Sequence, residues 1–294
     1  MSDTRDTGDS AAGLGFAFSA YFLWGFLPIY LKWLEPIGPI EIVAHRIIWS
    51  VPVAGAVLVV LGRTNTLRAA LRSPATLGMA AVTAGLITIN WSIYVYAVSV
   101  DRALDAALGY YINPLFSVFV GAVFLGERLD RLQWAAIALA AGAVVVLTVY
   151  AGRVPILAIG LTLSWGFYAL AKKQLPIGPN QGFLLEVLIL SIPAGLFIVW
   201  TEAQGTGAFA TAPLLLMGCG IVTAVPLLLY ANGAKRLKLS TIGILQYVAP
   251  TLIMLVALFV FGEPFGPARA IAFPMIWAAL ALYSVSLFRQ VRHG

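Results

Sequence analysis

The chain carries the same short sequence twice, once in each half. Residues 109–127 read GYYINPLFSVFVGAVFLGE, and residues 245–263 read LQYVAPTLIMLVALFVFGE. At one constant spacing, the first segment's Tyr111, Pro114, Gly126 and Glu127 match Tyr247, Pro250, Gly262 and Glu263 of the second. A further match lies near the start of each half, where Trp24, Gly25 and Phe26 correspond to Trp165, Gly166 and Phe167. This duplication predicts two copies of one structural unit.

The composition indicates that both copies lie in a membrane. Hydrophobic residues make up 61% of the chain and charged residues 10%, and the mean hydropathy is +0.94. These values exceed what a water-facing domain carries. A bilayer core about 30 Å thick needs roughly 20 apolar helical residues to cross it. Ten such stretches are present, at residues 11–31, 40–61, 75–99, 103–125, 132–151, 154–171, 182–200, 213–232, 239–261 and 268–288.

The fold class predicted is therefore an all-α integral membrane protein with ten transmembrane helices. We expect a disordered tail over 1–10, a first five-helix repeat over 11–152, a second over 153–288 and a C-terminal tail over 289–294. Because five is odd, the second repeat must enter the membrane from the opposite side, so the repeats are inverted. Inverted repeats that surround a midplane site are typical of alternating-access transporters. The alternative is a duplication that merely enlarged the bundle.

The basic residues predict the orientation of the bundle. Cytoplasmic loops carry an excess of Lys and Arg. Thirteen of these residues fall in the two tails and in the even-numbered loops, against five on the other face. Both termini are therefore predicted in the cytoplasm. The net charge of +6 is explained by this asymmetry and by anionic membrane lipid, and no nucleic-acid partner is expected.

Six segments carry a resemblance to a known family. They read LWGFLPIY (23–30), EIVAHRIIWS (41–50), NWSIYVYAV (90–98), LGYYINPL (108–115), FLGERLDRLQW (124–134) and LSTIGILQYVAPT (239–251). In this order they resemble the RarD-like permeases of the EamA-type drug/metabolite transporter superfamily. The resemblance implies two EamA repeats, a bacterial inner-membrane location, cytoplasmic termini and export of small metabolites, with relatives that export amino acids, aromatic ones included. One departure is that Asn113 of the first copy corresponds to Ala249 in the second.

Polar and aromatic residues at membrane depth are the candidates for a substrate cavity, because burying them in lipid is costly. Aromatic walls can hold a cation over a ring face, at about 0.5–2 kcal/mol, and amides can bind carboxylate or amino groups. This lining would suit small amphipathic solutes. For the Trp residues, the alternative is a role as membrane-interface anchors. The predicted cavity residues are Trp24, Asn90, Trp91, Tyr94, Tyr110, Asn113, Trp165, Tyr168, Gln246 and Tyr247.

Four prolines are hinge candidates, because a proline inside a helix removes a backbone hydrogen bond and kinks the chain. They are Pro28, Pro114, Pro226 and Pro250. The matched pair Pro114 and Pro250 fits a symmetric gate best, and the alternative is a static kink that improves packing.

An ionisable cluster lies at one end of the second stretch. Glu41 and His45 are four residues apart, with Arg46 adjacent, so Glu41 can pair with a protonated His45. Anchoring of the helix end is favoured over a proton relay. Glu127 and Glu263 follow glycines at helix ends and are interpreted as loop residues.

The sequence lacks the motifs of the common enzyme classes. The chain has two histidines and one cysteine, and its sequence contains no HExxH, GxxxxGK or GxSxG motif. We therefore expect no catalytic activity and no bound metal or cofactor. A passive pore, a non-transporting scaffold and a multidrug-type efflux carrier remain as alternatives. The small-residue-rich fifth and tenth stretches are expected at the periphery, supporting the bundle or a homodimer contact.

Overall fold

The computed structural model describes residues 10–62, 64–126, 128–234, 236–237 and 239–293. Most of the expected disordered tail, and the predicted loop residue Glu127, lie outside these ranges. The first half contains α1 (Ala11–Trp33), α2 (Pro39–Val60), α3 (Thr64–Leu71), α4 (Pro74–Ser99), α5 (Ala103–Leu125) and α6 (Arg131–Ala151). The second half contains α7 (Ile156–Gln174), α8 (Pro179–Ala203), α9 (Pro213–Ala234), α10 (Leu239–Leu245), α11 (Val248–Leu255), the π-helix η1 (Val256–Val260) and α12 (Gly266–His293).

Every one of the ten expected stretches contains helix, so the all-helical class is confirmed. Among the described residues, eight helices are long and apolar enough to cross a membrane, namely α1, α2, α4, α5, α6, α8, α9 and α12. The helix α7 and the interrupted helix α10–α11–η1 occupy the other two stretches, and the count of ten spans stays a prediction. The short helix α3 was not expected.

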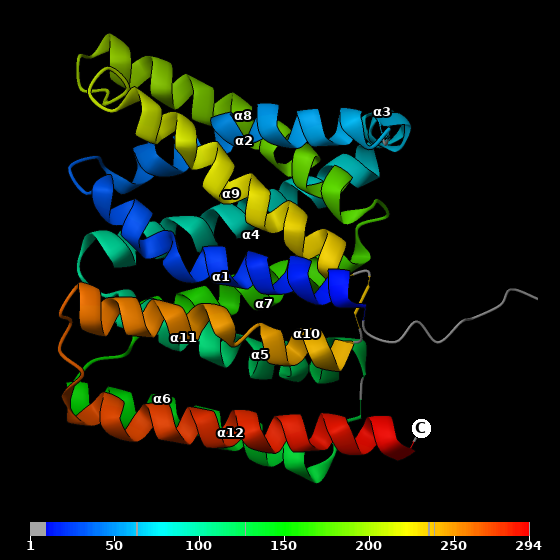
Figure 1. Ribbon diagram of the computed structural model, residues 1–294, viewed down its shortest axis with the longest axis vertical. Helices are drawn as coiled ribbons and strands as arrows, with labels where there is room; N and C mark the ends of the chain where they lie inside the picture. The colour runs from blue at the N-terminus through cyan, green and yellow to red at the C-terminus, as the bar shows by residue number, and fades with distance from the viewer. Residues whose placement is uncertain (1–9, 63, 127, 235, 238, 294) are drawn as a thin grey trace, which may run out of the picture.

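The long helices run side by side in stacked rows, with their connections at two opposite ends (Figure 1). The chain both enters α1 and leaves α12 at one of these ends, which we call the terminal end. The α2–α4, α5–α6, α7–α8 and α9–α10 connections also lie there. The opposite, loop end holds the α1–α2, α4–α5, α6–α7, α8–α9 and η1–α12 connections.

Local sequence explains where the helices begin and end. Prolines occupy the first turn of α2, α4 and α8, where the missing N–H needs no partner. Gly126 closes α5 in the left-handed conformation, with φ of 68°. Its repeat partner Gly262 has the same φ. The duplicated glycine is thus required by a helix-ending turn in both copies.

Contacts between the copies occur in equivalent pairs. In the first copy α1 packs on α9 and α11, and in the second α7 packs on α4 and α5. Gly25 of α1 is so close to Leu252 of α11 that a Cβ atom would overlap this side chain, and Gly166 of α7 is equally close to Phe116 of α5. Leu252 and Phe116 are themselves repeat equivalents, so the duplicated glycines allow the same close approach twice.

The equivalence fails at two places. The ninth stretch is broken at Gln246 and Tyr247, between α10 and α11, whereas α5 runs uninterrupted through Pro114. The break lies one turn before Pro250, whose ring cannot bond to the carbonyl four residues earlier. Because α5 tolerates Pro114 at the equivalent position, the proline permits the interruption but does not cause it by itself. In addition, α2 packs on α9 more extensively than α8 packs on α4.

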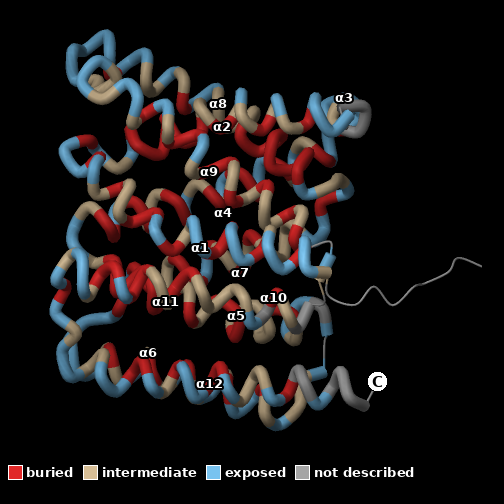
Figure 2. The backbone as a smooth tube through the Cα atoms, in the orientation of Figure 1, coloured by how far each residue is buried: buried red, intermediate tan, exposed pale blue. Residues whose placement is uncertain are grey.

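The helices α6 and α12 pack mainly on each other, at one edge of the bundle (Figure 1). Asp130 begins α6 by accepting the Gln133 N–H at 2.8 Å and also accepts the hydroxyl of Ser286 on α12. Buried residues gather in the rows above this pair, while much of α6 and α12 is exposed (Figure 2). The main buried core draws on helices of both halves, with α6, α8 and α12 also contributing to it.

Candidate substrate cavity

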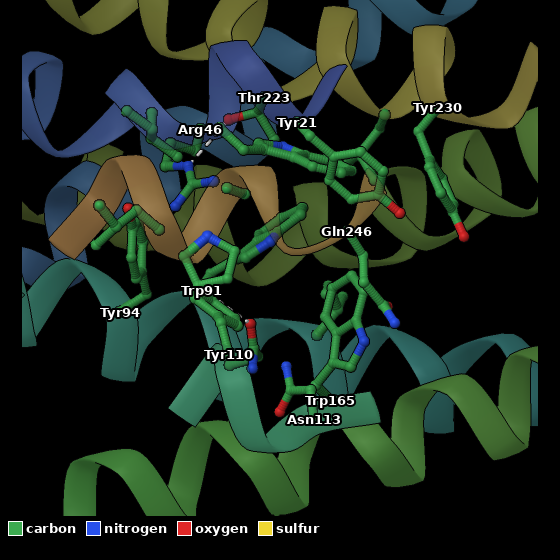
Figure 3. A pocket seen from close by; sticks show the side chains of 18 residues that line it. Tyr21, Arg46, Trp91, Tyr94, Tyr110, Asn113, Trp165, Thr223, Tyr230 and Gln246 are labelled. Carbon is green, nitrogen blue, oxygen red and sulfur yellow. Dashed lines mark hydrogen bonds between the residues drawn. The ribbon is translucent and has the colours of Figure 1, made fainter. Parts of the chain in front are cut away.

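A cavity of about 150 Å³ lies in the middle of the bundle, between the two copies. Figure 3 shows the side chains around it. Its lining comes from both halves and comprises Tyr21, Trp24, Leu27, Arg46, Ile87, Asn90, Trp91, Tyr94, Tyr110, Asn113, Trp165, Thr223, Leu227, Tyr230, Gln246, Ala249, Pro250 and Ile253. Eight of the ten predicted cavity residues belong to this set, Tyr168 and Tyr247 being the exceptions.

Aromatic rings form most of the wall. Trp24 lies in a cluster with Tyr21 and Tyr230, whose ring centroids are 5.7 and 5.8 Å from its own. Its repeat equivalent Trp165 packs beside Tyr168, with centroids 5.7 Å apart. The two copies thus contribute matched tryptophans from α1 and α7, each supported by a tyrosine.

Asn90 lines the cavity, but its amide is occupied by the protein. Its Nδ2 donates to the Leu161 carbonyl at 3.1 Å and to the Ser164 hydroxyl at 3.0 Å, and its Oδ1 accepts from the Tyr110 hydroxyl at 3.3 Å. These bonds join α4 to α7 and α5. The group predicted as a substrate ligand therefore holds three helices together.

Arg46 is the charged residue of the lining. Its side chain is 3% exposed, and its Nε donates to Thr223 Oγ1 at 2.9 Å (Figure 3). The guanidinium carbon lies 5.0 Å from the Trp91 ring centroid. Sequence reasoning grouped Arg46 with an end-of-helix cluster, whereas the structure directs it into the central cavity.

Only some of the remaining predicted cavity and hinge residues line a cavity. Gln246 lines both the central cavity and a second one, Tyr168 lines the second, and Tyr247 lines neither. Of the predicted hinges, Pro250 lines the central cavity and Pro114 the second, whereas Pro28 lies buried in α1 and Pro226 lies inside α9.

The second cavity has a volume of about 790 Å³ and adjoins the first on the side of the terminal end. The two share Trp165, Leu227, Tyr230 and Gln246. The larger cavity is also lined by Lys172 and Lys173, where α7 ends, and by Asn180, where α8 begins. The two adjoining cavities therefore extend from the aromatic wall to the end that carries both termini.

The other end of the bundle is held shut by polar contacts. Glu263 is 5% exposed and accepts the backbone N–H groups of Ala103 and Leu104 at 2.6 and 3.0 Å, so it caps α5. Burial raises the pKa of the Glu263 carboxyl, and the two N–H groups and Arg269 oppose this shift. Asp105 pairs with Arg102 at 2.5 Å and with Arg269 of α12 at 2.9 Å.

The expected pairing of Glu41 with His45 is absent from the described contacts. Glu41 Oε1 instead accepts the backbone N–H of Ala208, in the α8–α9 connection, at 2.7 Å. His45 accepts from Trp49 Nε1 at 3.3 Å and stacks on Phe209. A backbone N–H competes successfully for the carboxylate because it is fixed in place and needs no protonation. Both residues therefore fasten the loop end rather than face the cavity.

Sequence reasoning missed several lining residues. Tyr21, Thr223 and Tyr230 lie in apolar runs without a motif, and only the packing of α1 against α9 brings them to the cavity. The sequence does relate Arg46 to a residue of the second half. The tripeptide IGP occurs at 37–39 and 177–179, and the spacing between these two copies makes Glu186 the repeat equivalent of Arg46.

The fold and site define a multi-pass helical membrane protein with an aromatic cavity between two similar halves. The EamA-like transporter family matches the chain twice, over residues 11–149 and 153–285. The chain belongs to this family, in its RarD-like branch, and it is a membrane transporter.

Several relatives match over nearly their whole length. An uncharacterized transporter of Vibrio cholerae is 42% identical over 96% of this chain and 95% of its own. Protein RarD of Streptomyces exfoliatus is 39% identical over 97% and 92%, and Protein RarD of Escherichia coli is 37% identical over 95% of each chain. A crystal structure with 23% identity, covering 92% of this chain and 96% of its own, has a TM-score of 0.60 and shares the fold.

Proposed function

We propose that the protein is an inner-membrane carrier that exports small amphipathic metabolites, with amino acids, aromatic ones included, as the substrate class. The single observation that carries this proposal is the aromatic cavity between the two repeats, which adjoins a larger cavity on the side of the terminal end. Tryptophan and tyrosine rings provide contact area for an apolar side chain and a surface for an ammonium group.

The mechanism we propose is alternating access by exchange between the two repeats. The paired contacts of α1 with α11 and of α7 with α5 support it, because equivalent helices could exchange their packing. The unequal packing of α2 on α9 and of α8 on α4 is what a carrier in one of its two states would have. By this argument the structure represents the state that is open at the terminal end.

We assign the terminal end to the cytoplasm, on the excess of Lys and Arg in its loops. Lys172 and Lys173 at the mouth of the larger cavity belong to this excess. The substrate would then enter from the cytoplasm, as an exporter requires. Cysteine labelling of the termini in intact cells and in inverted vesicles tests this orientation.

Uptake into proteoliposomes tests the function. Purified protein is reconstituted, and flux of labelled amino acids is measured with and without an imposed pH gradient. We expect saturable flux of at least one aromatic amino acid, which Trp165→Ala weakens. The matched control is Trp134→Ala, because Trp134 is half exposed on α6, away from the cavity.

Each alternative predicts a different result. Flux that does not saturate and ignores competitors indicates a pore, and saturable flux of drugs but not of amino acids indicates a multidrug carrier. The absence of flux for every solute indicates a scaffold. Any of these three results contradicts the proposed function.

A further inference from the structure

Three buried polar atoms at the central cavity have no hydrogen-bond partner in the described part of the chain. They are Arg46 Nη1, Tyr94 Oη and Asn113 Oδ1, and all three residues line the cavity. Buried polar atoms are nearly always paired in folded proteins. Three unpaired atoms around one space therefore indicate that a ligand completes their hydrogen bonding.

Arg46 carries a full charge that no described carboxylate neutralises. The described ion pairs join other residues, and the described contacts of the guanidinium are with the Thr223 hydroxyl and the Trp91 ring, neither of which carries a charge. Isolating a charge from both water and counter-ions is strongly unfavourable. An anion in the cavity would remove this cost.

The repeat-equivalent position shows the contrasting case. Glu186 is 1% exposed, but it pairs with Lys172 Nζ at 2.6 Å and accepts from the Tyr168 hydroxyl at 3.3 Å. The second copy thus neutralises its buried charge with its own lysine. In the first copy, Arg46 lies at the equivalent position and lines the cavity without such a partner among the described residues.

We propose that Arg46 binds the carboxylate of the transported substrate, and that the carrier therefore selects monoanionic or zwitterionic carboxylates over amines and neutral solutes. This inference rests on the proposed function and narrows its substrate class. Among the described residues a single cation lines the central cavity, so one negative charge is matched, whereas a phosphate dianion would keep an uncompensated charge.

The surroundings hold the guanidinium ready for this contact. Thr223 accepts from Nε on one side, and the Trp91 ring packs against the group. Nη1 is left as the free donor, with the Tyr94 and Tyr110 side chains nearby (Figure 3). An arginine held on one edge and packed on an aromatic ring is pre-organised for a carboxylate. The rings of Trp24 and Trp165 would then contact the apolar part of the substrate.

A binding measurement tests this without requiring transport. The thermal stability of the detergent-solubilised full chain is measured with phenylalanine, 3-phenylpropionate, phenylalaninamide and phenethylamine. A ligand that binds only the folded state raises the unfolding temperature according to its affinity. We expect the two carboxylates to stabilise the wild type and the amide and amine to fail to do so. We expect Arg46→Gln to weaken carboxylate binding at least about tenfold, and Arg46→Lys to weaken it less.

Two controls separate binding from folding. Arg153→Gln removes an exposed arginine at the loop end and should leave carboxylate binding unchanged. Arg46→Met should raise the unfolding temperature of the ligand-free protein, because an apolar side chain replaces an unpaired charge. A purely structural arginine would give the opposite result.

The inference is overturned if phenethylamine and phenylalaninamide stabilise the wild type as well as the carboxylates do. It is also overturned if Arg46→Gln binds carboxylates normally, or if no carboxylate binds the wild type. The first two outcomes leave the carrier intact, because they change only its selectivity. Carboxylate binding that depends on Arg46, without any flux in proteoliposomes, would instead support Arg46 as a carboxylate site and refute the proposed function, and with it the transport of the bound carboxylate.

Discussion

Under the proposed alternating-access mechanism, we expect replacement of Glu263 with glutamine to weaken the closure of the loop end and to shift the carrier toward its opposite state. The Glu263 carboxylate caps α5 through two backbone N–H groups, from Ala103 and Leu104. These bonds connect the segment after η1 to the start of α5, and both must break when the loop end opens. They therefore stabilise the state seen here.

The size of the effect follows from these contacts. A hydrogen bond to a charged group contributes about 1.5–3 kcal/mol, and a carboxylate at a helix N-terminus adds about 0.3–1 kcal/mol. Glutamine keeps one acceptor oxygen and places an N–H₂ group toward the other donor, so one bond and the charge are lost. Because burial of the carboxylate offsets part of this gain, we expect a net loss of about 2 kcal/mol. This corresponds to about a thirtyfold larger population open at the loop end.

The assay is the reaction of a single cysteine with a membrane-impermeant maleimide. Cys219 is the one cysteine of the chain, and Cys219→Ser removes it. Ala107→Cys then places a thiol one turn into α5, at a position that is 0% exposed in this state. We expect Glu263→Gln to raise the labelling rate from the loop end by a factor of about thirty, in proportion to the open population.

The matched control is Glu35→Gln at the same end. Glu35 is 46% exposed and pairs with Lys32, and an exposed ion pair of this kind contributes little. It should leave labelling unchanged. If Glu263→Gln, still folded, labels at the wild-type rate, the cap of α5 does not hold the loop end closed.

Four further substitutions test the packing and the site. Trp165→Ala should raise the apparent KM for an aromatic amino acid about tenfold, measured as flux in proteoliposomes, because it removes one cavity wall. Asn90→Ala should lower the free energy of unfolding by about 1–3 kcal/mol, measured by thermal denaturation, because its bonds join three helices. Gly166→Ala should destabilise the fold by about 1–3 kcal/mol, whereas Gly15→Ala, with no neighbour within 4 Å, should not. Tyr111→Phe should cost about 0.5–1.5 kcal/mol in the same assay, through the lost 2.7 Å bond to Thr251.

Much of the cavity wall was accessible from the sequence. Trp24 and Trp165 stand out because they are duplicated, and Tyr94 and Asn113 stand out as polar or aromatic groups within apolar stretches. These signals are local, so they identify which residues face the protein interior at membrane depth. They do not reveal which of those residues already have partners. Asn90 was a reasonable substrate ligand until its three bonds to α5 and α7 were seen.

The charged residues were the least predictable part. Glu41 and His45 are suitably spaced to pair along one helix, yet each finds a partner elsewhere. Glu263 was interpreted as a loop residue, and its role appears only when α5 is brought beside it. An ionised side chain is stabilised by whichever groups surround it in three dimensions, and sequence spacing describes only those within its own helix.

The sequence by itself determined that this is a helical membrane protein in two similar halves, because hydropathy and duplication are properties of the chain alone. Tertiary structure decided which end is closed and which charge lacks a partner, because both depend on contacts between the halves. Arg46 and Glu186 occupy equivalent positions, and only the three-dimensional approach of Lys172, near the end of α7, gives Glu186 its cation. The corresponding space beside Arg46 is the central cavity.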